Sequence, residues 1–373
     1  MVPPSQPRLL WLCSDLESSN GWGSYARGLA EALIARGVPI RILTNRHHTD
    51  SLIDGAEVIP CLTSPLAPLD RPLALAWNAY QTARWRGAAD LVHAIVEPYA
   101  LGAQTPGSPG LIITLHGTYA VSPFREGALT RWSFRRALCN ARQVVCVSHY
   151  TKSRLLEKIE LSNIRVIPNG ARLPEDVVPG ASSTTGPLIL GVGAVKRRKG
   201  YHVSIEAVAL LKDEFPTLKY AIVGDASDRR YVDSLRQQIR DLKVEQQVAL
   251  HGQVSDEQLR EFYRTAHVFA LTPVNTGVAF EGFGLTYLEA GAYGLPVIGT
   301  LGCGAEDAII DGETGYLVPQ DSPEQVAARI RSLLLDPGHA HTLGERGRAH
   351  AHSFAWDRVA QNYLDVYSAA LER

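Results

Sequence analysis

Short apolar segments alternate with longer amphipathic segments along this chain, and this alternation limits its possible folds more than any other feature. In the first half, apolar runs typical of buried strands occupy 9–12, 40–43, 91–95, 111–115 and 144–147. Segments with helical periodicity lie between them, at 24–36, 69–86, 124–140 and 150–159. Because strands joined through helices pair in parallel, the pattern predicts an α/β fold whose parallel sheet is covered on both faces.

A polar, turn-rich segment over 169–187 interrupts the alternation, and we interpret it as an interdomain linker. A second series of strands follows at 188–192, 220–223, 248–250, 268–271 and 296–299, the last of which closes the series. Helices are predicted at 201–215, 230–242, 256–264 and 285–293. A final helix is predicted over about 355–371, with Val359, Tyr363, Val366 and Ala370 on one stripe.

The length of 373 residues also favours two domains, at roughly 150 residues per domain. We expect two doubly wound, Rossmann-like domains over 1–178 and 179–354, and a C-terminal helix over 355–373 that packs back across the domain junction. Open parallel sheets bind ligands beyond the carboxyl ends of their strands. The pattern therefore predicts an interdomain cleft that holds two substrates.

Charge and cysteine usage exclude several classes of protein. The formal net charge of −1 argues against nucleic-acid binding. The five cysteines form no C-x-x-C pair, which is typical of reduced thiols and disfavours structural zinc. Residues 1–7 lack the pattern of a secretory signal, and no apolar stretch reaches the ~20 residues of a membrane span. We expect a cytoplasmic protein.

The segment Gly21-Trp22-Gly23-Ser24-Tyr25-Ala26 fits the dinucleotide fingerprint G-x-G-x-x-A. However, the first predicted strand ends near Cys13, too far before Gly21 for the fingerprint's tight turn, and the second strand ends without an acid. These departures disfavour an NAD-dependent oxidoreductase. We interpret this glycine loop, at the start of a helix, as facing an anionic or polar ligand.

The segment 193–200 places four consecutive cations, from Lys196 to Lys199, between a predicted strand and a helix. Composition alone fits a solvated basic turn or a localisation signal equally well. The position at the carboxyl end of a strand favours a site for a diphosphate.

Two carboxylates, Glu281 and Glu289, lie eight residues apart around the start of a predicted helix. The glycines at 282 and 284 allow the backbone to approach a ligand closely. Glu289 falls in the second turn of the helix, where a carboxylate can accept hydrogen bonds from a vicinal diol such as ribose. A single stabilising acid near a helix N-terminus would explain neither the glycines nor Glu281.

In combination, these segments resemble the retaining glycosyltransferases of family four, which have the GT-B fold of two Rossmann-like domains and an E-x7-E motif. In the C-terminal half, the matching segments are 193–200, 223–225, 252–254, 281–289, 294–297, 311–318 and 354–357. The N-terminal half matches more loosely, at 21–23, 93, 115–117, 147–148 and 168–170.

The resemblance implies that the C-terminal domain holds a nucleotide-diphosphate sugar and that Glu281, His116 and Lys199 are catalytic. His116 would face the donor sugar from the N-terminal domain, whereas a lone histidine is equally well explained as structural. The donor-binding residues would be Gly193, Lys196, Arg198, Lys199, Gly224, Asp225, Gln253, Val254, Glu281, Gly282, Phe283, Gly284, Leu285 and Glu289.

Two departures from the family affect the donor site. Ala194 stands where the family usually has arginine, so Lys196, Arg197 or Arg198 would supply that charge, and Asp225 is followed by alanine instead of the commoner glycine. No two aspartates are two residues apart, so a D-x-D metal motif is absent from the sequence and we expect no cofactor and no metal requirement. The resemblance also implies retention of configuration, for which front-face attack is favoured because no residue is a convincing covalent nucleophile.

The N-terminal domain is expected to bind the acceptor, a sugar, a small molecule or a lipid-linked group. Its candidate contacts are Gly21, Trp22, Gly23, Ser24, Glu97 and Tyr99. The segments 84–86 and 131–136 mix arginines with aromatic residues. They could rest on the anionic inner face of a membrane, or they could be solvated helix faces whose arginine stems cover the core.

Other functions remain as alternatives. Related GT-B proteins include disaccharide synthases and phosphorylases, and a phosphorylase would use sugar 1-phosphate in place of a nucleotide donor. A non-catalytic sensor of nucleotide sugars is disfavoured because Lys199, Glu281 and Glu289 are all present. The preferred hypothesis is a retaining, metal-independent glycosyltransferase.

Overall fold

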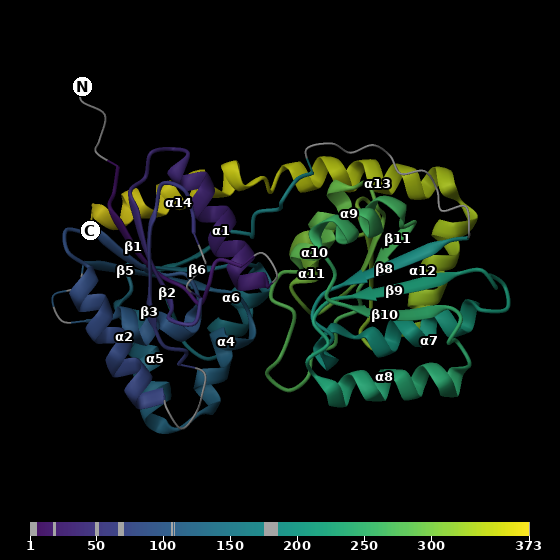
Figure 1. Cartoon of the computed structure of the whole chain (residues 1–373), viewed down its shortest axis with the longest axis horizontal. Helices are drawn as coiled ribbons and strands as arrows, with labels where there is room; N and C mark the ends of the chain where they lie inside the picture. The colour runs from purple at the N-terminus through teal and green to yellow at the C-terminus, as the bar shows by residue number, and fades with distance from the viewer. Residues whose placement is uncertain are drawn as a thin grey trace. The chain divides into compact units, whose positions relative to one another are not determined.

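The computed structural model describes residues 6–17, 20–48, 52–65, 71–105, 107, 109–174 and 186–372 (Figure 1). The chain divides into two compact units. Unit 1 consists of Met1–Gly170 and Ala355–Arg373, and unit 2 consists of Ala171–Phe354. The predicted linker over 169–187 contains this division, whereas the predicted boundary at 178–179 lies outside the described residues.

Unit 1 contains a parallel sheet with seven strands among its described residues, in the order β3-β2-β1-β4-β5-β6-β7. The strands are β1 (Leu9–Leu12), β2 (Ile40–Asn45), β3 (Glu57–Leu62), β4 (Leu91–Ala94), β5 (Gly110–Leu115), β6 (Gln143–Cys146) and β7 (Ile164–Val166). Strand β1 pairs with both β2 and β4, so the strand order reverses beside it. This is a doubly wound sheet, as the alternation predicted.

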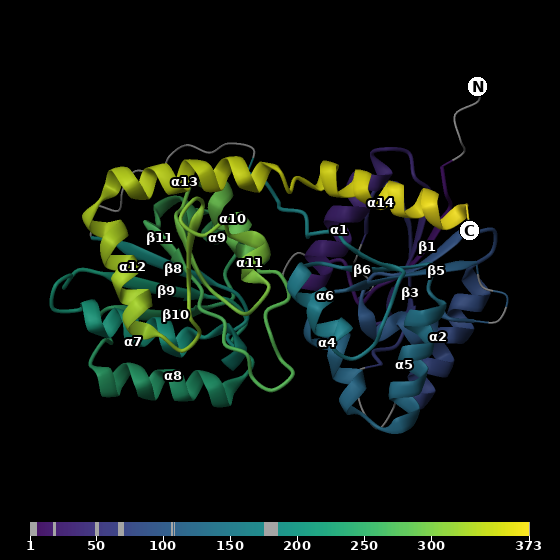
Figure 2. The ribbon, with the colours of Figure 1, turned by 180° about the vertical axis from the view of Figure 1, so that it is seen from behind.

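Helices cover both faces of this sheet (Figure 1, Figure 2). One face carries α1 (Gly21–Ile34) and α14 (Trp356–Leu371), and the other carries α2 (Arg71–Trp85) and α5 (Ala128–Asn140). The short helix α3 (Ala100–Ala103) packs against both α2 and α5. The shorter helices α4 (Thr118–Val121) and α6 (His149–Leu156) follow β5 and β6. The stripe predicted on α14 is confirmed, since Val359, Tyr363, Val366 and Ala370 are buried.

A buried chain of hydrogen bonds joins α14 to the rest of unit 1. The Tyr363 hydroxyl lies 2.5 Å from that of Tyr25 and 3.0 Å from Oγ1 of Thr114. The ring of His93 bonds Thr114 through Nε2 and the Tyr367 hydroxyl through Nδ1. Burial lowers the pKa of His93 to about 3, so the ring is neutral near pH 7. The last helix is therefore fixed to unit 1 by polar groups as well as by its apolar stripe.

Unit 2 contains a second parallel sheet, in the order β10-β9-β8-β11-β12-β13. Its strands are β8 (Leu188–Val192), β9 (Lys219–Val223), β10 (Val248–Gly252), β11 (Val268–Ala270), β12 (Val297–Thr300) and β13 (Gly315–Val318). The helices are α7 (Tyr201–Leu211), α8 (Arg229–Leu242), α9 (Asp256–Thr265), α10 (Leu285–Ala292), α11 (Ala305–Ala308), α12 (Pro323–Leu335) and α13 (Pro337–His352). The strand order reverses beside β8, which pairs with β9 and β11.

Three strands differ from the sequence prediction. The prediction lacked β3 and β7 and closed the second series at 296–299, but β13 pairs with β12 beyond it. All three missed strands lie at sheet edges. An edge strand buries less of its surface, so its apolar signal is weaker.

Candidate functional site

The carboxyl ends of three neighbouring strands meet at one edge of the unit 2 sheet. The amide of Gly193, after β8, donates to the Val223 carbonyl over 2.9 Å, and the amide of Gly224, after β9, donates to the Gly252 carbonyl over 2.8 Å. A Cβ atom on Gly224 would lie 2.2 Å from the Gly193 carbonyl oxygen, and its φ of +148° favours glycine. Glycine at this position therefore allows the two loops to touch.

The basic segment forms a short turn, η3 (Arg197–Lys199), between β8 and α7. The turn ends at Gly200, which has a φ of +71° and whose Cβ would lie only 1.6 Å from the Thr272 carbonyl oxygen. The Thr272 hydroxyl donates to the Gly200 carbonyl over 2.8 Å. These contacts lie at the reversal of strand order between β8 and β11, where doubly wound sheets bind ligands.

Two of the four cations turn inward toward Glu281, and both contact the same oxygen. Nη1 of Arg198 lies 2.7 Å and Nζ of Lys199 lies 2.8 Å from Oε2 of Glu281. Glu281 and Lys199 are buried and Arg198 is half-buried, whereas Lys196 and Arg197 are exposed. The four consecutive cations thus have different surroundings.

The charges in this cluster perturb one another. Burial alone would raise the pKa of Glu281, but the adjacent charges of Lys199 and Arg198 outweigh it and hold the pKa below its ordinary value. Burial lowers the pKa of Lys199, and the charge of Glu281 opposes that shift. Glu281 is consequently a carboxylate near pH 7 that shields two cations from each other.

Glu281 leads directly into helix α10. Its carbonyl accepts a hydrogen bond from the Gly304 amide over 2.8 Å, and the ring of Phe283 packs on Phe354 with 5.9 Å between ring centres. Gly284 is the N-cap and Leu285 is the first helical residue. The segment from Gly282 to Leu285 therefore leads from the charge cluster to a helix N-terminus, which favours anions.

Glu289 lies in the second turn of α10 in different surroundings. It accepts a hydrogen bond over 3.1 Å from the Tyr263 hydroxyl. Burial raises its pKa, and the Tyr263 hydroxyl, Arg172 and Lys199 oppose that shift. The two predicted carboxylates therefore have different contacts: Glu281 forms ion pairs with two cations, and Glu289 accepts a hydrogen bond from the Tyr263 phenol. Sequence reasoning missed Arg172, which has no motif around it.

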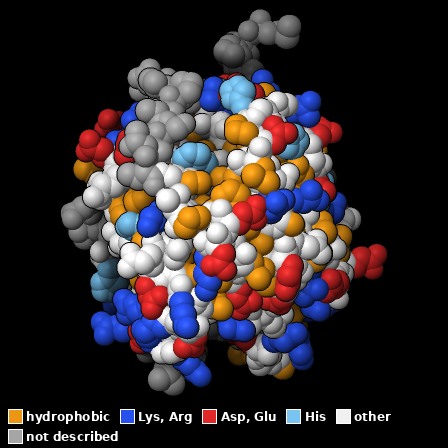
Figure 3. Space-filling view, turned by 90° about the vertical axis from the view of Figure 1, so that its right-hand side faces the viewer, with side chains coloured by type: hydrophobic (Ala, Val, Ile, Leu, Met, Phe, Trp, Pro, Cys, Tyr) orange, Lys and Arg blue, Asp and Glu red, His pale blue; other side chains and the backbone are white. Residues whose placement is uncertain are grey.

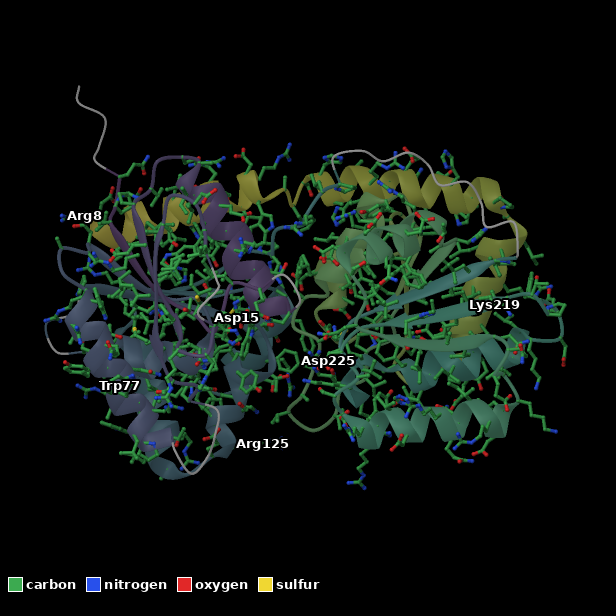
Figure 4. The ribbon with its side chains drawn as sticks, in the orientation of Figure 1. Arg8, Asp15, Trp77, Arg125, Lys219 and Asp225 are labelled. Atoms are coloured by element: carbon green, nitrogen blue, oxygen red, sulfur yellow. The ribbon has the colours of Figure 1, made fainter. Side chains whose placement is uncertain are left out.

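The remaining predicted donor residues lie along the same sheet edge but make local contacts. The Asp225 carboxylate, at the end of β9, accepts from the amide and hydroxyl of Ser227 over 3.0 Å and 2.7 Å (Figure 4). After β10, Gln253 is exposed and Val254 is half-buried. Their positions fit the lining of a ligand site, although no hydrogen bond described here joins them to Glu281.

In unit 1, the predicted residues Glu97 and His116 come together at the ends of β4 and β5. Oε1 of Glu97 accepts from the amides of His116 over 2.5 Å and Gly117 over 3.2 Å. The His116 ring donates through Nε2 to the Ile95 carbonyl over 2.8 Å, so Nδ1 carries the acceptor lone pair. Burial raises the pKa of Glu97 to about 7 and lowers that of His116 to about 4.

The glycine loop begins helix α1 beside them. The Asn20 side chain caps the helix by accepting from the Gly23 amide over 2.8 Å, and it donates to Asp15 over 2.8 Å. Sequence reasoning missed Asp15, which follows β1 as an acid after an apolar run (Figure 4). The Trp22 ring contacts Tyr119 with 5.2 Å between centres.

The other predicted acceptor residues differ in accessibility. Gly21 is exposed and Ser24 is half-buried at the start of α1, whereas Tyr99 is buried in the core of unit 1. A search of the described residues finds no group of three or more His, Cys, Asp or Glu side chains placed to hold a metal ion. Likewise, none of the helices in the described part of the chain is long and apolar enough to cross a bilayer.

Comparison with known proteins gives a consistent family. Residues 19–173 match the model of "Glycosyltransferase Family 4", and residues 174–350 match that of "Glycosyl transferases group 1". Over 96% of its length, the chain is 29% identical to a D-inositol 3-phosphate glycosyltransferase of Acidothermus cellulolyticus, of which 87% is covered. It is 30% identical to a GDP-mannose-dependent alpha-(1-6)-phosphatidylinositol monomannoside mannosyltransferase of Mycolicibacterium smegmatis, over 71% of this chain and 70% of that protein.

Solved structures share the fold at lower identity. Sucrose-phosphate synthase from Thermosynechococcus elongatus superposes with a TM-score of 0.78 at 23% identity, covering 97% of this chain and 98% of that one. HepE from Anabaena, in complex with UDP-glucose, gives a TM-score of 0.77 at 21% identity, covering 98% and 100%. Both the doubly wound architecture and the sequence matches agree with the predicted resemblance. The chain belongs to the family 4 glycosyltransferases and has their GT-B fold.

Proposed function

We propose that this glycosyltransferase moves a sugar from a nucleotide-diphosphate donor to an acceptor hydroxyl with retention of configuration and without a metal ion. The observation that carries the proposal is the contact of Lys199 and Arg198 with one oxygen of Glu281, directly before the N-terminus of α10. Buried cations beside a helix N-terminus suit a diphosphate, which gains negative charge as it leaves.

The donor residues divide by chemistry. Lys199 and Arg198 neutralise the diphosphate, and the amides from Gly282 to Leu285 meet its phosphate and the sugar. Glu281 holds a donor-sugar hydroxyl. Glu289 binds the ribose hydroxyls. The nucleotide lies along the strand-end residues Gly193, Lys196, Gly224, Asp225, Gln253 and Val254.

Relatives support a nucleotide-sugar donor. HepE was crystallised with UDP-glucose, and the mannosyltransferase of Mycolicibacterium smegmatis is named as GDP-mannose-dependent. The two relatives use different bases and sugars, so the donor of this chain has to be identified by experiment.

In the proposed mechanism, the sugar is transferred by front-face attack, which retains the configuration of the anomeric carbon. The bond from the anomeric carbon to the leaving phosphate breaks, the bond to the acceptor oxygen forms on the same face, and the phosphate oxygen takes the acceptor proton. His116 is neutral near pH 7 because burial lowers its pKa to about 4, and its Nδ1 accepts a hydrogen bond from a hydroxyl group of the donor sugar. In unit 1, the loop from Gly21 to Ser24 and Glu97 bind the acceptor, which is a sugar, a small molecule or a lipid-linked group.

A donor screen with chelator tests this proposal. Wild-type protein is incubated with UDP-, GDP-, ADP- and TDP-sugars in EDTA, with inositol 3-phosphate and simple sugars as acceptors, and nucleoside diphosphate release is measured. We expect one donor class to react without metal, and the product's anomeric coupling in proton NMR to match that of the donor. Activity that is lost in EDTA and restored by magnesium or manganese, or an inverted product, would contradict the mechanism.

Site variants then separate the two carboxylates. Glu281→Gln is expected to lower kcat sharply, because it removes the charge that organises Lys199 and holds the sugar. Glu289→Ala is expected mainly to raise the KM for the donor. Glu245→Gln, an exposed acid on the turn before β10, is the matched control and should behave as wild type. Formation of product from sugar 1-phosphate alone would identify a phosphorylase instead.

A further inference from the structure

Helix α2 of unit 1 is built with its polar side inward. Its buried side chains include the polar residues Asn78, Gln81 and Thr82, and the helix packs against α3. Asn78 accepts from the Thr63 amide and donates to the Thr63 carbonyl, each over 2.9 Å. The hydroxyl of Thr82 donates to the carbonyl of residue 102 over 2.9 Å. These bonds satisfy the buried polar groups and fix the rotation of the helix.

The outer side of α2 is correspondingly apolar. Leu73, which is 76% exposed, begins a stripe that continues through Trp77 and Tyr80 and ends at Arg84. This spacing of three and four residues places all of them on one face of the helix. The indole N–H of Trp77 donates to the Cys61 carbonyl over 2.8 Å, so the ring is held in place.

Helix α5 adds a second exposed surface with arginines. Leu129 is 75% exposed and Trp132 is also exposed, and the guanidinium of Arg136 lies 5.6 Å from the centre of the Trp132 ring. Arg131 and Arg135 are exposed on the same helix. The sequence contains no Asp or Glu over 71–85 or over 127–140.

The two helices belong to the same face of the unit 1 sheet. Each of them packs against α3, and both ribbon views show them on the side of the sheet opposite α1 and α14 (Figure 1, Figure 2). In Figure 3, where unit 2 faces the viewer, cations and acids are interspersed instead. The α2–α5 face, defined by Leu73, Trp77, Tyr80, Arg84, Leu129, Arg131, Trp132, Arg135 and Arg136, thus combines aromatic and apolar side chains with charge of one sign.

This combination fits one kind of partner. Tryptophan and tyrosine favour the boundary between lipid headgroups and acyl chains, and exposed leucines insert below it. The arginines of α2 and α5, two helices that contain no Asp or Glu of their own, are attracted to anionic headgroups, each by about 1 kcal/mol, which is roughly a fivefold change in binding. We propose that the α2–α5 face binds the surface of an anionic lipid bilayer. The proposal does not depend on the donor chemistry, but it would bring unit 1 to lipid-linked acceptors.

Co-sedimentation of the full chain with vesicles tests the proposal. The vesicles contain phosphatidylcholine alone or phosphatidylcholine and phosphatidylglycerol in equal parts, and no donor sugar is added. We expect binding only to the anionic vesicles, with a blue shift of tryptophan fluorescence. Raising the salt from about 0.1 M to about 1 M, which shortens the Debye length from about 10 Å to about 3 Å, should weaken it.

Paired variants assign the binding to this face. Arg131→Gln with Arg136→Gln should lower binding roughly 25-fold, and Leu73→Ser with Leu129→Ser should also lower it. Leu210→Ser with Leu335→Ser, at unit 2 positions that are 57% and 55% exposed, is the apolar control. Circular dichroism of each variant checks that it is folded.

The outcomes separate this proposal from its alternatives. Vesicle binding that is absent, equal with uncharged lipid, or equally weakened by the unit 2 control would overturn it. Light scattering also tests for a second copy of the chain as the partner. A dimer that Leu73→Ser with Leu129→Ser abolishes, in a protein that does not bind vesicles, would overturn the proposal. Since binding is measured without donor, a failed donor screen leaves the result intact.

Discussion

Replacing Glu281 by glutamine is the most informative perturbation of the donor-site charge cluster. The substitution keeps the size of the side chain but removes the negative charge that Lys199 and Arg198 share at 2.8 Å and 2.7 Å. The side chain of Arg198 is 30% exposed and can turn toward water, whereas that of Lys199 is only 10% exposed and stays buried. The unpaired charge of the variant is therefore that of Lys199.

Two outcomes for Lys199 set the range of stability that the variant loses. Leaving one partner of a buried ion pair uncompensated costs about 3–5 kcal/mol. Alternatively, Lys199 can lose its proton, which for an ordinary lysine pKa of about 10.4 costs about 4.6 kcal/mol at pH 7. We therefore expect Glu281→Gln to lower the free energy of unfolding of unit 2 by about 3–4.6 kcal/mol at pH 7.

The same reasoning fixes the pH dependence. Burial already lowers the pKa of folded Lys199, and loss of the Glu281 charge lowers it further, so the added penalty is present below the unfolded pKa and is lost above it. At pH 10, deprotonating the lysine costs only about 0.7 kcal/mol, and the difference from wild type should shrink accordingly. Adding Lys199→Met to Glu281→Gln removes the unpaired charge and should restore much of the stability at pH 7.

The distribution of tryptophan allows the two units to be followed separately. All six tryptophans lie outside residues 171–354, so their fluorescence in urea reports unit 1. Hydrogen exchange of peptides from β8 and β9 in rising urea reports unit 2. Glu245→Gln is the control for loss of an exposed acid. A loss below about 1 kcal/mol at pH 7, or an equal loss at pH 10, would refute the claim that Glu281 compensates a buried cation.

Three further substitutions test other parts of the structure. Gly200→Ala should destabilise unit 2 by more than about 2 kcal/mol in urea, because φ is +71° and Cβ would lie 1.6 Å from the Thr272 carbonyl; wild-type stability would refute this. Tyr363→Phe, which loses hydrogen bonds of 2.5 Å and 3.0 Å, should lower the stability of unit 1 by about 1–3 kcal/mol by tryptophan fluorescence, and an unchanged midpoint would contradict it. Burial raises the pKa of Glu97 from 4.5 to about 7, so Glu97 ionises at lower pH in the unfolded chain than in the folded one. The free energy of unfolding of unit 1 should therefore fall by up to about 3 kcal/mol as the pH rises between these values. Glu97→Gln should abolish this pH dependence, and an unchanged pH dependence in the variant would exclude Glu97 as its source.

The interior strands of the fold were predictable because burial on both faces makes them continuously apolar. Strand β8 is of this kind and was confirmed. The apolar stripe of helix α14 was also confirmed, because its three- and four-residue spacing marks one buried helix face. The missed strands β3, β7 and β13 lie at sheet edges, where β3 contains Pro60 and begins with the exposed Glu57. Their sequences resemble loops because one side of each strand has no partner in the sheet.

Helix α2 shows a different limit of sequence reasoning. Its existence was predicted, but the rule that apolar residues face inward predicts Leu73, Trp77 and Tyr80 in the core. They are exposed instead, because Asn78 and Thr82 bond backbone groups of neighbouring segments. Those acceptors come from other parts of the chain, and a local pattern holds no information about them.

The candidate donor site combines both situations. Spacing, position after a strand and the family resemblance predicted Glu281, Glu289 and the basic turn as site residues, but which cations reach Glu281 depends on how the turn folds. Arg198 and Lys199 point inward, whereas Lys196 and Arg197 stay exposed. Of the three residues expected to replace the arginine missing at Ala194, Arg198 is therefore the one that contacts Glu281. The two carboxylates of one motif likewise acquire opposite properties from their contacts.

Two cations hold the pKa of Glu281 below its ordinary value, whereas burial raises that of Glu289 beside the Tyr263 hydroxyl. Neighbouring acids whose pKa values are pushed apart are suited to different tasks. Glu281 compensates the charges of Lys199 and Arg198, and in the proposed function these two cations turn from Glu281 to the diphosphate of the donor. Glu289 accepts its hydrogen bond from the neutral phenol of Tyr263, and the charges of Arg172 and Lys199 do not outweigh its burial; in the proposed function its other oxygen binds hydroxyl groups. The division of roles along E-x7-E therefore follows from what each acid touches, not from the spacing between them.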